Sequence, residues 1–404
     1  MSSEKNAVRP WIMLILVLLA SIAPPLAMFK VAPVMETIQN EFSITAAQGG
    51  LVSTLFSLVP IVLSIPVGIL VSRYGNYRLG LASLFFVIAG SCLGAVSGSL
   101  SVLLISRVIE GIGMALICTV GPAIVNEIIP PEQRGKAMGI FLWYISLGQA
   151  FISTLSPVIL RFTGGWRGIW WFTSAYSLLF LLLWLFCLKG LKNREMGRKD
   201  EASPDSAKQM NNSIFEVMKN RDLWLLTLCI LAFMISIQGI LAFYPTFFTQ
   251  VKGLESMKAI RLTGMHGYIG CVGAVVSGFI MDKTGAGKWK WMGVLVMIAS
   301  AVLYGVLPAF PASLALLIIL MVGFAVNMMP PLIYAIVPEV CRSSRDIAMA
   351  MGIVNTGMNL GTFVSAILFG AMIDRFGWNA AFLFSAVMAV ICAVCMLLLK
   401  NIRK

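Results

Sequence analysis

Twelve long apolar runs constrain this chain of 404 residues more than any other feature of its sequence. Each run is about 20 residues long, which is enough for a helix to cross the hydrocarbon core of a bilayer. Only 12% of the residues are charged, about half of the roughly 25% that is typical of soluble domains. The sequence therefore predicts an all-α integral membrane protein. The predicted membrane helices cover residues 11–33, 48–70, 79–98, 101–126, 137–160, 168–188, 223–248, 262–281, 289–308, 312–336, 347–371 and 379–399.

The net charge of +13 is distributed unevenly over the segments that connect these helices. If both termini are cytoplasmic, 22 of the 30 Lys and Arg residues fall in cytoplasmic segments. Cytoplasmic loops of membrane proteins are enriched in Lys and Arg, so this bias predicts a multi-pass protein of the inner (plasma) membrane with both termini in the cytoplasm. Because topology explains the basic excess, we expect no nucleic acid partner.

Residues 189–222 differ in composition from the rest of the chain, with eight basic and six acidic side chains among 34 residues. A segment so rich in charge cannot bury an apolar core, which predicts a cytoplasmic linker. The linker separates a predicted N-terminal six-helix bundle (residues 1–188) from a C-terminal one (residues 223–404).

The two predicted bundles resemble each other in sequence. GILVSRYG at 68–75 corresponds to GFIMDKTG at 278–285, and the triplet MGI occurs at 138–140 and again at 351–353. These matches indicate parallel repeats and therefore pseudo-symmetric bundles. Parallel repeats in a membrane bundle usually place a binding site at their interface, near the bilayer midplane.

Strongly polar residues are absent from the interiors of the third, sixth, ninth and twelfth predicted helices. Such residues are costly in a membrane and normally face the interior of a bundle or a water-filled cavity. We therefore expect every third helix to be peripheral and the other helices to line a cavity. The other helices contain Lys30, Arg107, Glu110, Asn126, Gln149, Gln238, His266, Asn327, Asn355 and Asn359.

Glycines and basic residues recur in the loop after the second helix and in the matching loop of the second half. The first loop follows the pattern G-x-L-x-D-R-x-G-x-x-R, except that Ser72 stands at its acidic position, and the second copy keeps the acid as Asp282. The fourth helix has the pattern R-x-x-x-G-x-G at 107–113. With twelve helices, these motifs resemble those of the major facilitator superfamily. The resemblance implies a secondary transporter that works by alternating access, with a gating motif at Gly68, Arg73, Gly75, Arg78, Gly278, Asp282 and Gly285. The alternative is that Arg73 and Arg78 only determine the topology.

Lys30 lies inside the first apolar run, within the stretch PPLAMFKVAP. One interpretation is that its long side chain extends to the membrane interface. The other is that it faces the central cavity and binds an anion, because cations within a membrane are usually functional. A buried ammonium needs an anionic partner, and Glu110 is the nearest candidate within the chain.

Arg107 and Glu110 are three residues apart, so they share one face of the fourth helix. They either form a pair that only orients this helix, or Arg107 and Glu110 are the proton-coupling residues, with Glu110 as the acid. His266, the only histidine, is either a proton relay or a bystander at the interface. The residues that we expect to bind substrate are Lys30, Gln238, Tyr244, Asn327, Tyr334, Asn355 and Asn359.

Three classes of function are compatible with such a chain. A secondary transporter is favoured by the repeats and the polar pattern, whereas a membrane enzyme would need a catalytic motif such as H-E-x-x-H, which is missing from this sequence. A third possibility is a membrane sensor that does not transport, and the sequence leaves this alternative open. We expect no cofactor, no metal site and a monomer in the lipid bilayer.

Among transporters, the choice lies between a carrier of small anions and a drug exporter. Proton-driven export of cationic drugs usually requires a membrane acid that faces the substrate. Here the one acid, Glu110, is accompanied by two cations, Lys30 and Arg107. We therefore expect a small organic or inorganic anion moved with protons, with proton-driven drug efflux as the alternative.

Overall fold

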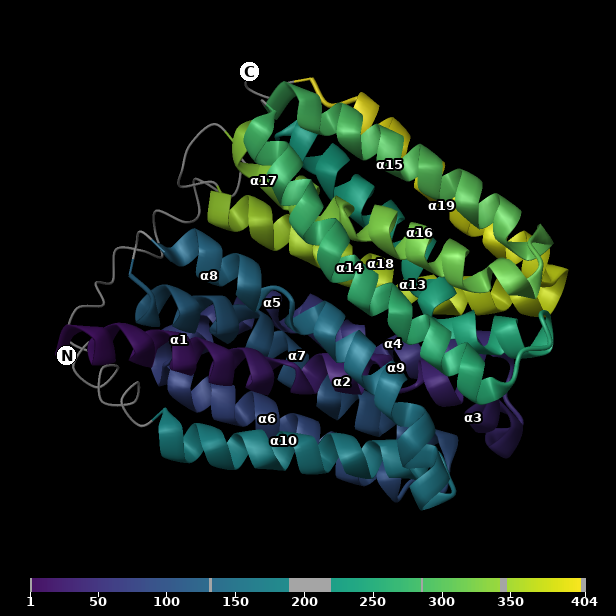
Figure 1. Ribbon diagram of the computed structural model, residues 1–404, viewed down its shortest axis with the longest axis horizontal. Coiled ribbons are helices and arrows are strands. Elements are labelled where there is room, and N and C mark those ends of the chain that lie inside the picture. The colour runs from purple at the N-terminus through teal and green to yellow at the C-terminus, as the bar shows by residue number, and fades with distance from the viewer. Residues whose placement is uncertain (1, 131–132, 189–218, 285, 342–346, 401–404) are drawn as a thin grey trace. The chain divides into compact units, whose positions relative to one another are not determined.

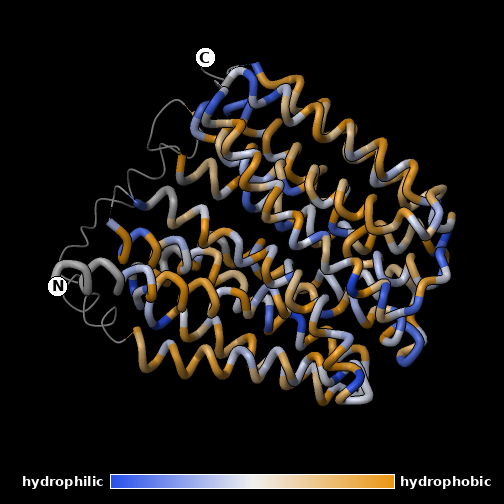
Figure 2. Tube along the Cα trace, viewed as in Figure 1, coloured by the Kyte–Doolittle hydropathy of each residue, from blue (hydrophilic) through white to orange (hydrophobic). Residues whose placement is uncertain are grey.

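A computed structural model of the protein describes residues 2–130, 133–188, 219–284, 286–341 and 347–400 (Figure 1). Every regular element in these ranges is a helix, and twelve helical spans are long and apolar enough to cross a membrane. Apolar residues cover most of the length of these helices, while hydrophilic residues are most frequent near their ends (Figure 2). The predicted all-α fold with twelve membrane helices is confirmed.

The described residues form two compact units. Unit 1 comprises those within 1–31 and 58–202, and unit 2 comprises those within 32–57 and 203–404. Residues 32–57, which the sequence assigns to the first bundle, thus pack with the second half of the chain in this structure. Most of the predicted linker, residues 189–218, lies outside the described residues.

Unit 1 contains the helices of the first half. They are α1 (Ser2–Ser21), α2 (Ala23–Phe29), α5 (Leu58–Tyr74), α6 (Asn76–Ala95), α7 (Leu100–Ile128), α8 (Arg134–Phe141), α9 (Tyr144–Thr163) and α10 (Arg167–Cys187). Helix α6 packs along both α7 and α10, and α6 and α10 lie side by side in Figure 1. Glycine allows this close packing, because a Cβ atom on Gly113 of α7 would overlap the Ser83 carbonyl oxygen of α6.

The first membrane span is interrupted rather than continuous. Helix α1 ends at Ser21, and α2 begins with Pro24 and Pro25 in its first turn, where the missing N–H groups of proline cost nothing. The whole span runs from Pro10 to Phe42, so it is longer than the predicted 11–33. Lys30, at the end of α2, therefore lies in the interior of the span rather than at its end.

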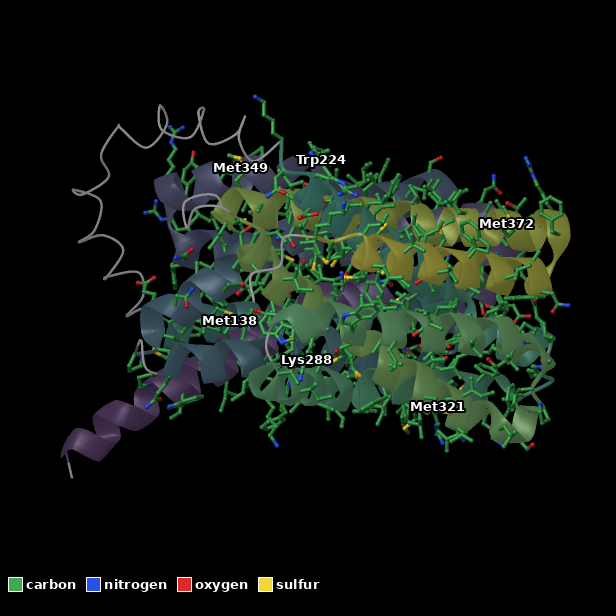
Figure 3. All side chains as sticks on the ribbon, turned by 90° about the horizontal axis from the view of Figure 1, so that it is seen from above. Met138, Trp224, Lys288, Met321, Met349 and Met372 are labelled. Carbon is green, nitrogen blue, oxygen red and sulfur yellow. The ribbon has the colours of Figure 1, made fainter. Side chains whose placement is uncertain are left out.

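Unit 2 contains the helices of the second half together with the segment 32–57. They are η1 (Ala32–Val34), α3 (Met35–Phe42), α4 (Ala46–Thr54), η2 (Leu55–Ser57), α13 (Arg221–Gln250), α14 (Ser256–Lys283), α15 (Ala286–Val306), η5 (Leu307–Ala309), η6 (Ala312–Leu314), α16 (Ala315–Asn327), α17 (Met329–Val340), α18 (Ile347–Phe376) and α19 (Trp378–Leu397). In Figure 3, Met349 and Met372 mark the two ends of the long helix α18.

Helix α4 packs closely against α18 within unit 2. The Asp374 carboxylate accepts hydrogen bonds from the backbone N–H groups of Ala46 (3.0 Å) and Ala47 (2.9 Å), the first residues of α4. Cβ atoms on Gly50 or Gly370 would overlap backbone atoms of the facing helix. Small residues and a carboxylate at the helix N-terminus therefore hold these two helices together.

Gly75 and Gly377 each form a one-residue turn between two membrane helices. Gly75 joins α5 to α6 with φ 81°, and Gly377 joins α18 to α19 with φ 80°. Residues with a Cβ atom rarely adopt this left-handed backbone region. The glycine of the first-half motif is thus required by a one-residue turn between two membrane helices.

Candidate functional site

The buried side chain of Lys30 marks the candidate functional site of unit 1. Its ammonium nitrogen donates a hydrogen bond to Ser91 Oγ (3.0 Å) and forms an ion pair with Glu110. It also lies 4.5 Å from the centre of the Trp170 ring. The relative exposure of Lys30 is 0%, so a carboxylate, a hydroxyl and an aromatic face replace water around the cation.

Both carboxylate oxygens of Glu110 have partners. Oε1 accepts from Lys30 and from the Ser91 hydroxyl (2.7 Å), and Oε2 accepts from Arg107. Arg107 and Glu110 are neighbours along one face of α7, as their spacing predicts. Glu110 is therefore the shared anion of two cations that come from different helices.

Arg107 also bonds to the end of α2. Its guanidinium donates to the carbonyl oxygens of Ala27 (2.6 Å) and Met28 (3.4 Å). The last carbonyls of a helix have no hydrogen-bond donor inside that helix, and because the chain is interrupted after α2, these carbonyls lie in the membrane interior. Arg107 supplies the donors and thereby links α7 to α2.

The cluster of Lys30, Arg107 and Glu110, hereafter the ion cluster, contains two cations and one carboxylate, each with 0% exposure. Removing one partner from a buried ion pair costs about 3–5 kcal/mol, because an uncompensated charge stays behind. Within the ion cluster, two cations therefore share one carboxylate.

Sequence patterns do not predict two residues of the site, Ser91 and Trp170. They belong to α6 and α10, the third and sixth membrane helices, which lack the strongly polar residues that were used to find a cavity. Small residues around Ser91 were the available signal: a Cβ atom on Gly90 would overlap the Glu110 side chain, and one on Gly94 would overlap the Trp170 indole.

The structure brings together three of the residues predicted to bind substrate in unit 2. The Tyr334 hydroxyl donates to Asn355 Oδ1, and Asn359 Nδ2 donates to the Asn355 carbonyl oxygen (2.9 Å). Gln238 lies elsewhere on α13, where its amide contacts the Met234 sulfur at 3.9 Å. Asn327 ends α16 and donates to the Gly323 carbonyl (2.8 Å). All five are partly buried.

The described residues of the predicted gating motif lie on α5, α6 and α14 and in the turn at Gly75. Arg73 and Arg78 are exposed on either side of the turn at Gly75, and Gly68 and Gly278 lie within α5 and α14. Gly285 and the side chain of Asp282 fall outside the described part of the chain. The gating role of this motif stays a prediction.

Unit 2 buries a second polar cluster of a different kind. Tyr244 on α13, His266 on α14 and Tyr304 on α15 are at most 2% exposed. The two hydroxyls and both ring nitrogens of His266 have no hydrogen-bond partner among the described residues. Each such atom costs about 1–3 kcal/mol, so four of them together approach the roughly 5–15 kcal/mol of net stability of a typical domain.

Comparison with known proteins identifies the family of the chain. A family model described as the Major Facilitator Superfamily matches residues 17–348 and 316–404. The chain belongs to this superfamily. A probable sulfoacetate transporter of Cupriavidus necator is 24% identical over 364 residues, which cover 84% of this chain and 82% of the relative. A probable L-galactonate transporter of Escherichia coli is 23% identical over 363 residues, 84% of this chain and 77% of the relative.

Solved structures of superfamily members share the fold. A D-xylose-proton symporter superimposes with a TM-score of 0.78 at 17% identity, covering 97% of this chain and 98% of the symporter. A bacterial homologue of the human lysosomal transporter Spinster gives 0.76 at 16% identity, with 97% of each chain covered. The protein is therefore a multi-pass membrane transporter of a small solute, with twelve helices in two six-helix halves, and it is not an enzyme.

Proposed function

We propose that this transporter moves a small organic anion together with protons, and that Lys30 and Glu110 form its coupling pair. The observation that supports the proposal is the unequal charge of the ion cluster, in which Lys30 and Arg107 share one carboxylate at 0% exposure. Charged groups inside a membrane are costly unless they are paired. A transported anion would supply a second negative charge to the ion cluster.

The two cations differ in what they retain if Glu110 takes up a proton. Arg107 keeps its bonds to the Ala27 and Met28 carbonyls, so it stays attached to α2. Lys30 keeps only the Ser91 hydroxyl and the Trp170 face. Protonation of Glu110 therefore frees Lys30 rather than Arg107, and the substrate anion competes with the Glu110 carboxylate for the Lys30 ammonium.

The named relatives agree with an anionic substrate. Sulfoacetate and L-galactonate, the compounds in the names of two relatives, are both organic acids that are ionised at neutral pH. At 24% and 23% identity these relatives support a class of substrate rather than one compound. In the second half, we propose that substrate is bound by Gln238, Tyr244, Asn327, Tyr334, Asn355 and Asn359.

The remaining expectations complete the proposal. Both termini lie in the cytoplasm, residues 189–222 join the bundles as a linker, and the gating motif controls opening in a monomeric protein. Labelling of a cysteine introduced at Lys199 with a membrane-impermeant maleimide tests this topology. Reaction from outside intact cells would contradict it, while protection that is lost on permeabilisation would support it.

Glu110→Gln tests the coupling pair, because Gln preserves the shape and one acceptor oxygen of Glu while it removes the titratable charge. In proteoliposomes, we expect wild-type protein to accumulate sulfoacetate or L-galactonate when the outside is acidic and to lose this accumulation with an uncoupler. The Glu110→Gln variant should still exchange labelled anion across the membrane but should not accumulate it.

The matched control is Glu255→Gln, which changes an exposed residue just before α14 and should accumulate the anion like the wild type. Accumulation that still follows the proton gradient in Glu110→Gln would contradict the coupling role and leave the ion cluster as a structural element. Transport of cationic drugs but of no anion would instead support the efflux alternative.

A further inference from the structure

A pair of buried cysteines in unit 2 has no role in the proposed transport cycle. Cys229 lies on α13, and Cys392 lies on α19, 163 positions later in the sequence. Their sulfur atoms are 3.3 Å apart, and either thiol can donate a hydrogen bond to the other. Both side chains have 0% exposure, so the two thiols meet without solvent between them.

Helix packing holds the two sulfur atoms in contact. Helices α13 and α19 pack along each other, and the Cys229 sulfur also lies 3.7 Å from the Cys392 carbonyl oxygen. A disulfide bond is about 2.05 Å long, so the sulfur atoms, now 3.3 Å apart, would have to approach by about 1.3 Å. Rotation of the side chains about their Cα–Cβ bonds supplies a shift of this size.

The pair lies close to one end of both helices. Cys392 is five positions before Leu397, the last residue of α19, and Cys229 is eight positions after Arg221, the first residue of α13. At 1.5 Å per residue, these separations are about 8 and 12 Å. The Lys400 backbone N–H, just beyond α19, lies 3.5 Å from the Asp222 carboxylate, so the two helix ends are adjacent. A small uncharged oxidant therefore has only a short path from these ends to the thiols.

A second sulfur in contact determines what an oxidation produces. An isolated buried thiol is chemically inert, and its oxidation has no second thiol with which to form a disulfide. A hydroperoxide oxidises one thiol to a sulfenic acid and is itself reduced to an alcohol or water. The second thiol then displaces the hydroxyl group, which forms the disulfide and releases water. In total, the two thiols lose two electrons and two protons, and the hydroperoxide takes up both.

We propose that Cys229 and Cys392 form a reversible disulfide site, oxidised by a small hydroperoxide and reduced again by a small dithiol through thiol–disulfide exchange. In the exchange, the dithiol becomes the disulfide and both cysteines regain their protons. The oxidised site joins α13 to α19 covalently. It is independent of the proposed substrate and of proton coupling.

Peptide mapping after treatment with hydrogen peroxide tests this site in the full-length protein in lipid nanodiscs. Acid stops the reaction, the remaining thiols are alkylated in denaturant, and the peptides are analysed by mass spectrometry without reduction. We expect the peptides that contain Cys229 and Cys392 to be cross-linked in most of the molecules, with the loss of two hydrogen atoms. Dithiothreitol, a small dithiol, should remove the cross-link and restore both thiols.

The matched control is Cys395→Ala. Cys395 follows Cys392 by three positions on α19 and is 4% exposed, so it is a second buried thiol on the same helix. We expect Cys395→Ala to form the cross-link like the wild type.

Two results would overturn the proposal. If Cys229 and Cys392 both remain thiols in the wild type, they serve only as small packing residues. If either is instead oxidised to a sulfinic acid or cross-linked to Cys395, the contact between the two sulfurs does not direct the reaction.

Discussion

The two units bury their polar groups in opposite ways. In unit 1 the ion cluster is charged, and both oxygens of Glu110 and the ammonium of Lys30 have direct protein partners. In unit 2 the cluster of Tyr244, His266 and Tyr304 is neutral and lacks such partners among the described residues. The same repeated six-helix architecture therefore encloses two kinds of chemistry.

The difference follows from the cost of burial. An unpaired ion in a low-dielectric interior costs far more than an unpaired hydroxyl, so charges must be matched by fixed groups while neutral groups can be satisfied by water. Unit 2 buries the Asp222 carboxylate at the start of α13 and exposes that of Asp374, which caps α4. The buried ion pairs of Glu110 with Lys30 and Arg107 belong to unit 1, and this is why we propose the coupling pair there.

Arg107→Leu should have the largest effect on stability, because it removes one cation of the ion cluster of unit 1. The substitution leaves Glu110 with one cation and the α2 carbonyls without a donor, so we expect a loss of about 3–5 kcal/mol in the free energy of unfolding. Thermal unfolding of purified protein measures the effect. Arg161→Leu, at an exposed position at the end of α9, should change stability by no more than about 0.5 kcal/mol. Equal effects of the two variants would mean that the ion cluster does not stabilise unit 1.

A smaller effect is expected where packing supports the ion cluster. Gly94→Ala adds a Cβ atom that overlaps the Trp170 indole, and overpacking of this kind costs about 1–3 kcal/mol. Thermal unfolding should show the loss, and tryptophan fluorescence should report the displaced ring. Gly98→Ala is the matched control, since a Cβ atom there meets nothing within 4 Å. A Gly94→Ala variant as stable as Gly98→Ala would contradict the packing of Trp170 on α6.

The smallest effect is expected in unit 2. If water or the Ser236 hydroxyl satisfies the Tyr304 hydroxyl, Tyr304→Phe should lower the free energy of unfolding by about 1 kcal/mol, the net value of one hydrogen bond. If the hydroxyl is unpaired, the same substitution removes a buried polar group and should stabilise the protein. The sign of the change in melting temperature therefore separates a satisfied hydroxyl from an unpaired one.

The sequence predicts the membrane helices well because the length and polarity of an apolar run are local properties. The first span shows where this reasoning fails. Its last helix, α3, contains Glu36, Gln39, Asn40 and Glu41, and these polar residues hide the continuation of the span to Phe42. The prolines of α2 indicate a bend, but they do not show how far the chain continues beyond it.

The candidate site was predictable only in part. The spacing of Arg107 and Glu110 places them on one helix face, and Lys30 needs an anion wherever it is buried. Ser91 and Trp170, which contact Lys30, follow it in the sequence by 61 and 140 positions. Contacts between such distant residues depend on how whole helices pack. The contact between the rings of Tyr244 and His266 depends on helix packing in the same way.

Lys30→Met gives the most direct test of the proposal that Lys30 of the ion cluster binds the transported anion. Met keeps the length and apolar volume of Lys without its charge, and the Arg107–Glu110 pair remains, so the variant should fold. Isothermal titration with sulfoacetate or L-galactonate compares it with the wild type and with Lys258→Met, which removes an exposed lysine of α14. Losing a charge-assisted contact of about 1.5–3 kcal/mol predicts binding weaker by about ten- to a hundredfold in Lys30→Met alone. An unchanged affinity in folded Lys30→Met protein would contradict the anion site at Lys30 and the proposed coupling pair with it.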